Sequence, residues 1–298
     1  MTNWLQGAVD VHVHASPSIF PRLYDAERLV AEAQLAGMRG VLLKAHEGST
    51  AELAATVQKR VTRLQVRGGI VLNHFVGGFN PLAVEMNLAL GGQMVWMPTM
   101  HAANHMRHFG FAGFPHQTSL VRKWALPPLS VLDERGKLLD SVQQVLEVMA
   151  GRTAALSAGH LSSPEIAVLF KAARARKIAR LVLTHAELPL MRCSFEFQRQ
   201  MAALGVFIER SFLPTMRAGQ SGASDANSFP IEQTAREVLE LGPERVVLET
   251  DLGQAVNMPP TEGLARFCQR LHELGVPEPA LRQMVGTNPG YVLNLPPE

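Results

Sequence analysis

The stretch Ala8-Val-Asp-Val-His-Val-His14 decides the fold class that we predict for this chain. Its apolar and polar residues alternate, which is typical of a β-strand whose two faces differ. The strand ends in a His-x-His pair. Five further histidines and one aspartate also stand where an apolar, strand-like run ends: His46, His74, His101, His160, His185 and Asp251. A lone histidine is usually structural, so it is the repetition at strand ends that indicates a shared site.

Strand-like and helix-like segments alternate along the whole chain. The predicted strands are Ala8–His14, Met38–His46, Gly69–His74, Gln93–Met100, Thr153–His160, Ala179–His185, Val206–Leu213 and Arg245–Asp251. The predicted helices are Asp25–Ala36, Thr50–Leu64, Pro81–Leu90, Ser141–Ala150, Ser163–Lys177, Arg192–Leu204, Ile231–Leu241 and Thr261–Leu274. About eight such units predict an α/β fold, a (β/α)8 TIM barrel. An open doubly wound sheet is the alternative, but no Gly-x-Gly-x-x-Gly turn follows the first strand.

One segment breaks this alternation. Ala102–Asp140 is a long insertion after the fourth strand, interrupted by glycines and prolines. Within it, Asp133–Gly136 lies between two short apolar runs and predicts a small hairpin. Loops of this length inside a compact domain are usually functional, often as lids. No linker or low-complexity tract is visible, so we expect residues 1–298 to form a single domain.

Composition narrows the classes of function. The chain has 298 residues, 47% of them hydrophobic, and a formal net charge of +2. The near-neutral charge argues against nucleic acid or an anionic membrane as partner. No apolar stretch approaches the roughly 20 residues of a membrane span, Met1–Gly7 lacks a signal-like segment, and two cysteines are too few for a disulfide framework. We therefore expect a cytoplasmic protein that acts on a small molecule, with homo-oligomerisation left open.

Alternation within each strand predicts which side chains point into the barrel. In the first strand, Asp10, His12 and His14 share the inward face. Three further inward pairs are predicted: Ala158 with His160, Leu183 with His185, and Glu249 with Asp251. The histidines and Asp251 then lie at the carboxyl ends of their strands, where the active sites of barrels occur. Neutral imidazole nitrogens that converge there suit a transition metal such as Zn²⁺.

These residues resemble the metal site of the amidohydrolase superfamily. The chain reads Asp-Val-His12-Val-His14, Ser-Ala-Gly-His160, Leu-Thr-His185 and Glu-Thr-Asp251. The superfamily's pattern is His-x-His on strand one, a histidine on each of strands five and six, and an aspartate on strand eight. The ending Gly286-Thr-Asn-Pro-Gly also resembles the Asn-Pro segment that often closes these barrels. The resemblance spans essentially the whole chain and is greatest to a poorly characterised branch of stand-alone barrels with a Leu-Lys-x-His element on strand two, here Leu43-Lys44-Ala45-His46.

The resemblance implies a role for each matching residue. His12, His14 and Asp251 would hold a first metal. His160 and His185 would hold a second metal or, in an enzyme with one metal, bind the substrate. Asp251 would also be the general base and acid, which takes a proton from a metal-activated water and passes it to the leaving group. The implied cofactor is one or two divalent transition metals, zinc first, with iron, manganese, nickel and cobalt as alternatives.

The chain departs from the superfamily's pattern at the bridging ligand. Members with two metals usually carry a carboxylated lysine or a glutamate on strand three or four, whereas strand four here ends in Met97-Pro-Thr-Met-His101. Lys44, inward on strand two, is the substitute that the sequence offers as a metal bridge. The alternative is a buried ion pair of Lys44 with Asp10 or Glu249, because an unpaired buried ammonium group is unfavourable.

Four further residues are predicted to contact the substrate. His46, His74 and His101 stand at neighbouring strand ends, where they would hydrogen-bond the substrate, stabilise an oxyanion or support the metal ligands. Arg210 would clamp a carboxylate, although alternation does not settle whether Glu209 or Arg210 points inward. The basic residues of the insertion, His105 among them, suit either a lid over an anionic substrate or a solvated loop.

Two kinds of enzyme fit this set of residues. We expect a metal-dependent hydrolase that attacks the carbonyl of an amide, cyclic amide, lactone, ester or thioester. The alternative is a metal-dependent decarboxylase of the same superfamily acting on a small carboxylate, which an arginine clamp would favour. A non-catalytic barrel would lack some ligand, and none is missing. The substrate depends on loops, mainly Ala102–Asp140 and Pro214–Pro230, and the fold does not fix it.

Overall fold

The chain folds into parallel β-strands separated by helices. The computed structural model describes residues 3–114, 125–191, 193–220 and 228–296. Its strands are β1 (Val9–Val13), β2 (Gly40–Leu43), β3 (Gln65–Arg67), β4 (Gly69–Val71), β5 (Met94–Trp96), β6 (Ala155–Ser157), β7 (Leu181–Leu183), β8 (Phe207–Ser211) and β9 (Val246–Glu249). β1 to β3 form one sheet and β4 to β9 another, both in sequence order and with parallel pairing. The predicted α/β fold with parallel strands is confirmed.

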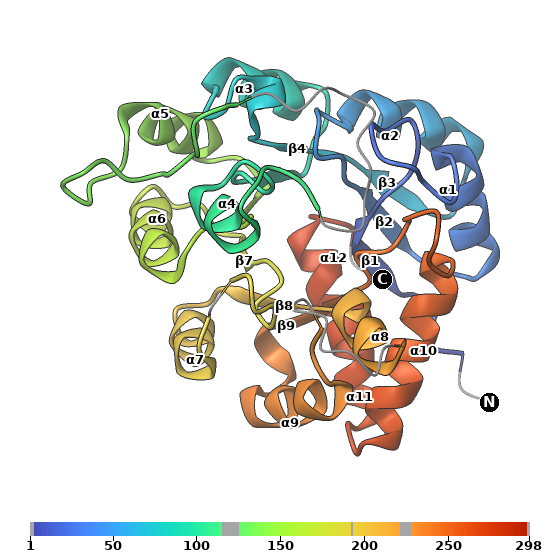
Figure 1. Cartoon of the computed structure of the whole chain (residues 1–298). Coiled ribbons are helices and arrows are strands. Elements are labelled where there is room, and N and C mark those ends of the chain that lie inside the picture. Colours follow the sequence, from blue (N-terminus) through green and yellow to red (C-terminus); the bar gives the residue numbers. More distant parts are fainter. Residues whose placement is uncertain (1–2, 115–124, 192, 221–227, 297–298) are drawn as a thin grey trace.

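Helices lie around the strands (Figure 1). The helices that match a predicted one are α1 (Ala26–Leu35), α2 (Ala51–Val57), α3 (Pro81–Ala89), α5 (Asp140–Met149), α6 (Ser163–Ala175), α7 (Phe195–Ala203), α9 (Ile231–Leu241) and α10 (Pro260–Glu273). A capping side chain marks the start of some of these helices. The side chain of Asp25 accepts a hydrogen bond from the Arg28 amide at 2.7 Å at the start of α1, which satisfies a backbone donor that the helix itself leaves unpaired.

Several elements are not predicted by the sequence. The helix expected to reach Leu64 ends at Val57 and is followed by a 3₁₀ turn, η1 (Gln58–Arg60), and by β3. The strand expected to reach Leu213 ends at Ser211, because helix α8 (Phe212–Gln220) begins there. Other short elements complete the chain: η2 (His74–Val76), α4 (Ala103–Phe109), η3 (Pro243–Arg245), α11 (Glu278–Arg282), the π-helical turn η4 (Gln283–Thr287) and α12 (Asn288–Val292).

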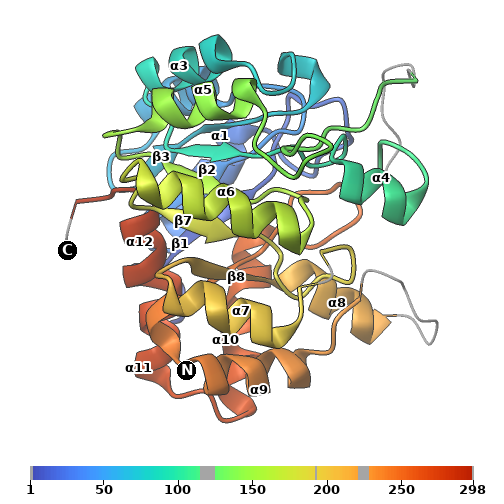
Figure 2. The same ribbon diagram turned by 90° about the vertical axis from the view of Figure 1, so that its left-hand side faces the viewer.

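The segment after β5 is only partly loop. It begins with α4, and an antiparallel bridge joins Leu132 to Leu138. The Asp133 amide donates to the Lys137 carbonyl at 2.8 Å, which closes the predicted hairpin. Part of the predicted insertion, residues 115–124, lies outside the described residues. Figure 2 shows α4 and α8 at one end of the molecule and α12 at the opposite end.

The two sheets adjoin each other at two places. β3 and β4 are separated only by Gly68, so one continuous segment pairs with β2 on one side and with β5 on the other. Near the other edges, Val13 forms a parallel bridge with Leu252. The His14 amide also donates to the Leu252 carbonyl at 2.8 Å, and the Asp251 amide donates to the His12 carbonyl at 3.0 Å. The first and last strands of the chain therefore lie side by side.

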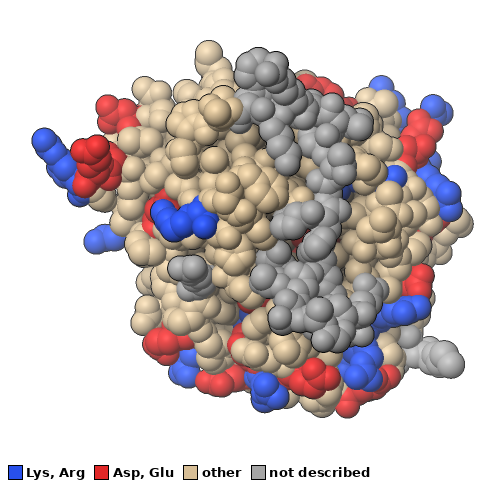
Figure 3. Space-filling model, viewed as in Figure 1, with Lys and Arg blue, Asp and Glu red and all other residues tan. Residues whose placement is uncertain are grey.

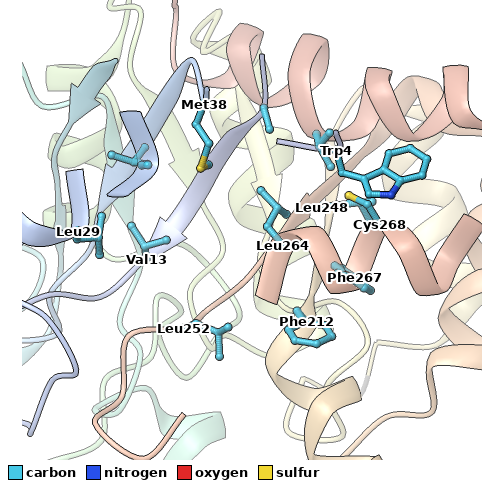
Figure 4. Packing of buried hydrophobic residues seen from close by; sticks show 14 of the residues in the cluster. Trp4, Val13, Leu29, Met38, Phe212, Leu248, Leu252, Leu264, Phe267 and Cys268 are labelled. Carbon is cyan, nitrogen blue, oxygen red and sulfur yellow. The ribbon is translucent and has the colours of Figure 1, made fainter. Parts of the chain in front are cut away.

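Apolar residues form an inner cluster and two outer ones. The inner cluster takes side chains from both sheets and from the C-terminal helix: Val9, Val11, Leu42, Val71, Met94, Trp96, Ala155, Val182, Phe207, Val247, Val292 and Leu293. The outer clusters join the strands to the surrounding helices. Figure 4 shows part of one, in which Val13 lies beside Leu29 of α1 and Leu248 lies beside Leu264 of α10.

β1 departs from the predicted alternation. Its register with β2 shifts between Asp10 and Val13, as at a β-bulge. Val11 consequently lies in the inner cluster, while Asp10 borders a small cavity beside α1 and accepts a hydrogen bond from the Thr250 hydroxyl at 2.6 Å. The prediction that Asp10 shares the inward face of His12 is therefore wrong, because one irregular residue changes the alternation of the strand.

Charged side chains lie mainly around the rim of the face shown in Figure 3. Both signs are present there, as expected from the formal net charge of +2. Among the described residues, no helix combines the length and the apolar character needed to cross a membrane.

Candidate metal centre

His12, His14 and Asp251 meet as predicted, and we call them the outer group. Their ligand atoms lie within 4.8 Å of one another. Asp251 Oδ1 is 3.2 Å from His12 Nε2 and 3.0 Å from His14 Nε2. Both imidazole rings are buried, whereas the Asp251 side chain keeps 16% of its surface exposed. The carboxylate is therefore the member of the group that can meet a substrate.

The ring of His14 has a fixed protonation pattern. Its Nδ1 lies 2.9 Å from the Lys44 carbonyl oxygen, which can only accept, so Nδ1 carries the ring proton. Burial, together with the charge of Arg22, lowers the pKa of His14 to about 4, so the ring is neutral at pH 7. The lone pair of Nε2 then faces a carboxylate oxygen at 3.0 Å. Two acceptors at this distance repel each other unless a cation lies between them.

A second set of four buried residues lies next to the outer group, and we call it the inner group: His12, His185, Glu209 and Glu249. His12 belongs to both groups. Its Nδ1 is 3.6 Å from Glu209 Oε2 and 3.9 Å from Glu249 Oε2. Burial raises the pKa of Glu209 to about 8 and that of Glu249 well above its ordinary value. The structure thus settles the alternation that the sequence leaves open, with Glu209 on the inward face.

His185 is oriented by a chain of hydrogen bonds. Its Nδ1 lies 2.8 Å from Ser211 Oγ, and the Ser211 hydroxyl donates to Glu249 Oε1. Because that hydroxyl proton is already used, His185 Nδ1–H must be the donor, and the lone pair of Nε2 lies 3.9 Å from Asp251 Oδ2. The backbone is left-handed at His185 (φ 49°) and at Asp251 (φ 52°), a conformation that is unfavourable for non-glycine residues and that clusters at functional sites.

His160 lies beside the two groups and belongs to neither. Its ring is 5.7 Å from that of His185 and stacks on His105 of α4 with 5.1 Å between ring centroids. His105 Nε2 is 2.7 Å from the Gly113 carbonyl and so carries the ring proton. Its Nδ1 accepts a hydrogen bond from His160 Nδ1 at 2.9 Å, because burial lowers the pKa of His105 to about 4. His160 Nε2 is consequently left as a lone pair.

Lys44 makes a different contact from those predicted. Its Nζ lies 2.7 Å from His12 Nε2 and 5.3 Å from the centre of the Trp96 ring. Burial lowers the pKa of Lys44 to about 8, against the opposing charges of Asp251, Glu209 and Glu249. Within the described residues, neither of the predicted ion pairs, with Asp10 or with Glu249, is formed. Its role as a metal bridge stays a prediction.

The three histidines predicted to bind substrate separate into two places. His46 stacks on His14 with 5.1 Å between centroids, and its Nδ1 is 3.0 Å from Thr99 Oγ1. His74 and His101 instead contact each other, with 5.0 Å between centroids, and His74 Nε2 lies 2.7 Å from the Pro127 carbonyl. In the described part of the chain, no hydrogen bond, ion pair or ring contact joins these two to the outer or inner group.

Arg210 points away from the histidines. Its guanidinium lies 2.8 Å from Glu237 Oε2 on α9 and donates to Gln198 Oε1 on α7 at 2.6 Å. It is fully buried in this position. The structure therefore places the predicted carboxylate clamp between β8 and the helices instead of at the site.

Aromatic rings form one wall of the site. The Phe114 ring is 4.8 Å from His46, 5.4 Å from His105 and 5.8 Å from Phe20. Phe20 also meets His46 edge-on at 5.8 Å. Rings from the loop after β1 and from the segment after α4 thus lie against the histidines and form an apolar wall beside them.

The donor set fits a divalent transition metal. Imidazole nitrogens and carboxylate oxygens suit zinc, iron, manganese, nickel and cobalt alike. Among the described residues, four buried atoms of the inner group have no hydrogen-bond partner: His12 Nδ1, Glu209 Oε1, Glu209 Oε2 and Glu249 Oε2. Leaving such polar atoms unpaired inside a protein is unfavourable, and a bound cation would satisfy them.

Solved structures share this fold over nearly the whole chain. An amidohydrolase from Burkholderia multivorans with bound HEPES superposes with a TM-score of 0.61 at 13% identity, covering 97% of this chain and 99% of that one. An amidohydrolase from Pseudomonas aeruginosa gives 0.60 at 13% identity, covering 98% of each chain. The organophosphorus hydrolase from Deinococcus radiodurans gives 0.59 at 11% identity, covering 98% and 94%. The fold is that of the amidohydrolases.

Sequence comparison identifies the family. Residues 7–209 match a family of unknown function, DUF6282, and the chain belongs to that family. No curated protein matches the chain. The family name assigns no activity, so the function must be argued from the site.

Proposed function

We propose that this protein is a metal-dependent hydrolase of the amidohydrolase superfamily, in the branch that carries Leu43-Lys44-Ala45-His46. One observation carries the proposal: the neutral His14 ring presents a lone pair to the Asp251 carboxylate at 3.0 Å. A cation between them would turn this repulsion into two metal–ligand bonds. The amidohydrolase fold and the strand-end position of both residues support the same conclusion.

The proposal includes a closed (β/α)8 barrel. Two observations favour closure: the bridge from Val13 to Leu252, and the inner cluster, to which the strands of both sheets contribute. With β3 and β4 counted as one interrupted strand at Gly68, eight strand positions follow one another around the barrel. The segment after β5 would be an insertion that carries α4 over the site.

The residues of the outer group suit hydrolysis of a carbonyl-type bond. A divalent transition metal held by His12, His14 and Asp251 would supply Lewis-acid chemistry and lower the pKa of water. The Asp251 carboxylate would take the proton of the attacking water and later give it to the leaving group. The buried ammonium group of Lys44 helps to keep Asp251 ionised, because its charge lowers the pKa of that carboxyl. An amide, cyclic amide, lactone, ester or thioester would react in this way.

The surroundings of Arg22 support the proposal that the substrate is small and carries an anionic group. This residue follows β1, and its charge lowers the pKa of His14. Its Nε donates to Ser18 Oγ at 3.2 Å, whereas in the described part of the chain both terminal nitrogens are buried without a partner. Burial lowers the pKa of Arg22 to about 10, so the group is still charged at pH 7. A carboxylate or phosphate would accept hydrogen bonds from both nitrogens.

The substitution Arg22→Met tests this assignment. We expect the KM of an anionic ester or lactone to rise at least about 30-fold, the equivalent of about 2 kcal/mol, because removing one member of a buried charge pair loses about that much or more. The KM of a matched neutral substrate should change little. Steady-state kinetics on the two substrates check this, with the exposed Arg199→Met as the control. Equal losses for both substrates would refute the anionic clamp.

Metal dependence tests the proposed function itself. The purified protein is expected to contain a divalent transition metal, measured by elemental analysis. Chelation should abolish hydrolysis across a panel of esters, lactones, amides and thioesters, and re-addition of Zn²⁺, Mn²⁺ or Co²⁺ should restore it. A folded protein that binds none of these ions would overturn the proposal. Release of CO₂ from a carboxylate in the panel would instead identify the decarboxylase alternative, which a clamp at Arg22 keeps open.

A further inference from the structure

We propose that the inner group binds a second divalent transition-metal ion, distinct from the ion of the outer group. This inference rests on the proposed function, since the two groups share His12. The ligands would be His12, His185, Glu209 and Glu249, each of which offers an atom within 4.8 Å of the atoms of the others. The second metal site would thus be built from two glutamates of β8 and β9, without Lys44 or His160.

The backbone sets the two glutamates on the same inward face. Phe207 and Val247 lie in the inner apolar cluster. Because side chains alternate along a strand, Glu209 and Glu249 point to the same side two residues later. β8 and β9 are neighbours, with Glu209 in register with Val247 and Ser211 in register with Glu249. Both carboxylates are fully buried next to the equally buried His12.

Four polar atoms of this group lack a hydrogen-bond partner among the described residues, as noted above. These atoms are not paired with one another either. His12 Nδ1 is 3.6 Å from Glu209 Oε2 and 3.9 Å from Glu249 Oε2, and both distances exceed the length of a hydrogen bond. Ligands of one tetrahedral ion with bonds of about 2.1 Å lie about 3.4 Å from each other. These separations therefore fit atoms that share a cation.

Charge leads to the same conclusion. On binding a divalent cation, Glu209 and Glu249 would give up their protons, and their two negative charges would cancel the charge of the ion. The two imidazoles would add neutral ligands. The Lys44 ammonium faces the other nitrogen of His12, Nε2, at 2.7 Å. Among the described residues, Lys44 forms no ion pair with either glutamate of the inner group, although its charge acts on both.

Occupation of both groups changes the protonation of His12. Its Nδ1 faces the inner group and its Nε2 faces the outer one. A neutral imidazole has a single lone pair, so binding one ion at each nitrogen requires release of the ring proton to solvent. The alternative is that Glu209 and Glu249 only orient His12 by accepting its Nδ1–H while one metal binds at Nε2. The number of ions per chain separates these two arrangements.

The experiment counts metal ions on the full chain. Metal-free protein would be titrated with Co²⁺ and with Zn²⁺, followed by desalting, elemental analysis and the visible absorption spectrum of the Co²⁺ form. We expect two ions per chain in the wild type and one in Glu209→Gln and in Glu249→Gln, which keep the size of the side chain. Glu165→Gln is the matched control, because Glu165 is a buried glutamate that accepts from the Ser162 amide at the start of α6. It should keep both ions.

The metal counts that would refute the inner site are the following. One ion in the wild type that persists in Glu209→Gln would overturn the inner site and leave the proposed function intact. No ion in the wild type would overturn both. Two ions retained in folded Glu209→Gln and Glu249→Gln, or two lost together from both, would also refute an inner site held by these glutamates. Circular dichroism on each variant shows that the chain has folded, and either glutamate variant suffices if the other does not fold.

Discussion

Replacing Asp251 with asparagine is expected to lower the kcat/KM of the proposed hydrolase by about 10²- to 10⁴-fold, which is the usual contribution of a general acid–base group. Asparagine fills the same volume but cannot take a proton from water. The carboxylate is the one partly exposed member of the outer group, so within that group the proton transfer has no substitute. Steady-state kinetics on the best substrate of the panel measure the effect.

Two controls separate catalysis from folding in this experiment. Asp133→Asn changes an aspartate of the hairpin after β5 whose carboxylate accepts from the Arg135 and Lys137 amides and belongs to neither group, so it should leave kcat/KM unaltered. The melting temperature and the metal content of Asp251→Asn show whether its site is still formed. A loss of less than about tenfold in a folded, metal-loaded variant would remove Asp251 from the role of general base.

The metal-free protein is expected to lose stability steeply as the pH falls below about 6.5. Seven buried histidines have pKa values that burial lowers: His12, His14, His46, His101, His105, His160 and His185. The unfolded chain binds protons on these rings near pH 6.5, whereas the folded chain does so only at lower pH, because burial lowers the pKa values. Their contribution to stability is therefore complete above pH 6.5 and lost as the pH falls through the folded pKa values.

Four buried carboxyl groups offset part of this slope: Asp10, Glu187, Glu209 and Glu249. Burial raises their pKa values, for Asp10 and Glu187 to about 7. Their contribution is complete below their unfolded pKa values, near 4, and falls as the pH rises toward 8. Between pH 4.5 and 6.5, seven histidines against four carboxyl groups leave about three protons taken up on unfolding. The free energy of unfolding should then change by about 4 kcal/mol per pH unit.

Urea unfolding at intervals between pH 7 and pH 4 measures this slope. Below pH 4.5 the slope should steepen, because the unfolded carboxyl groups also become protonated. His105→Phe replaces the stacked ring and should reduce the slope by about one proton, or about 1.4 kcal/mol per pH unit. A stability that does not vary over this range would mean that the histidines titrate in the folded protein, and hence that the site is open to water.

The sequence predicts the order of strands and helices well. Each strand is a short apolar run, and in each helix the apolar residues repeat with the helical period. It also predicts that His12, His14 and Asp251 meet. It does not predict how His160 and His185 reach the site. Ala158 and Leu183 face an outer cluster, contrary to the prediction. His160 and His185 follow strands that have already ended, and left-handed residues redirect the chain there.

Gly159 shows why alternation fails at this point. Its φ is +56°, and a Cβ there would lie 2.2 Å from the Met97 carbonyl oxygen. Only glycine fits so close to the neighbouring strand, and the turn it makes reverses the face of the next side chain. No rule of strand periodicity contains this information, because the constraint comes from residues far away in the sequence.

His105 and Glu209 show the same limit. His105 lies in the segment after β5, where the sequence offers lid and solvated loop as alternatives, yet it is buried against His160. Its contact spans 55 positions of the chain, so no local pattern could reveal it. Glu209 stands beside Arg210, and only the end of β8 at Ser211 fixes which of the two faces inward. A glutamate inside a buried strand is not recognisable as a ligand from its neighbours alone.

The bridge between β1 and the residues after β9 makes completion of the site a late event in synthesis. His14 and Asp251 are 237 positions apart, yet their side chains touch. Chains grow from the N-terminus, so the two histidines leave the ribosome long before their carboxylate partner does. A nascent chain that lacks β9 offers two imidazoles on an unpaired strand edge. Metal binding at the outer group, as proposed above, would thus require that the last strand has been made and has packed beside the first.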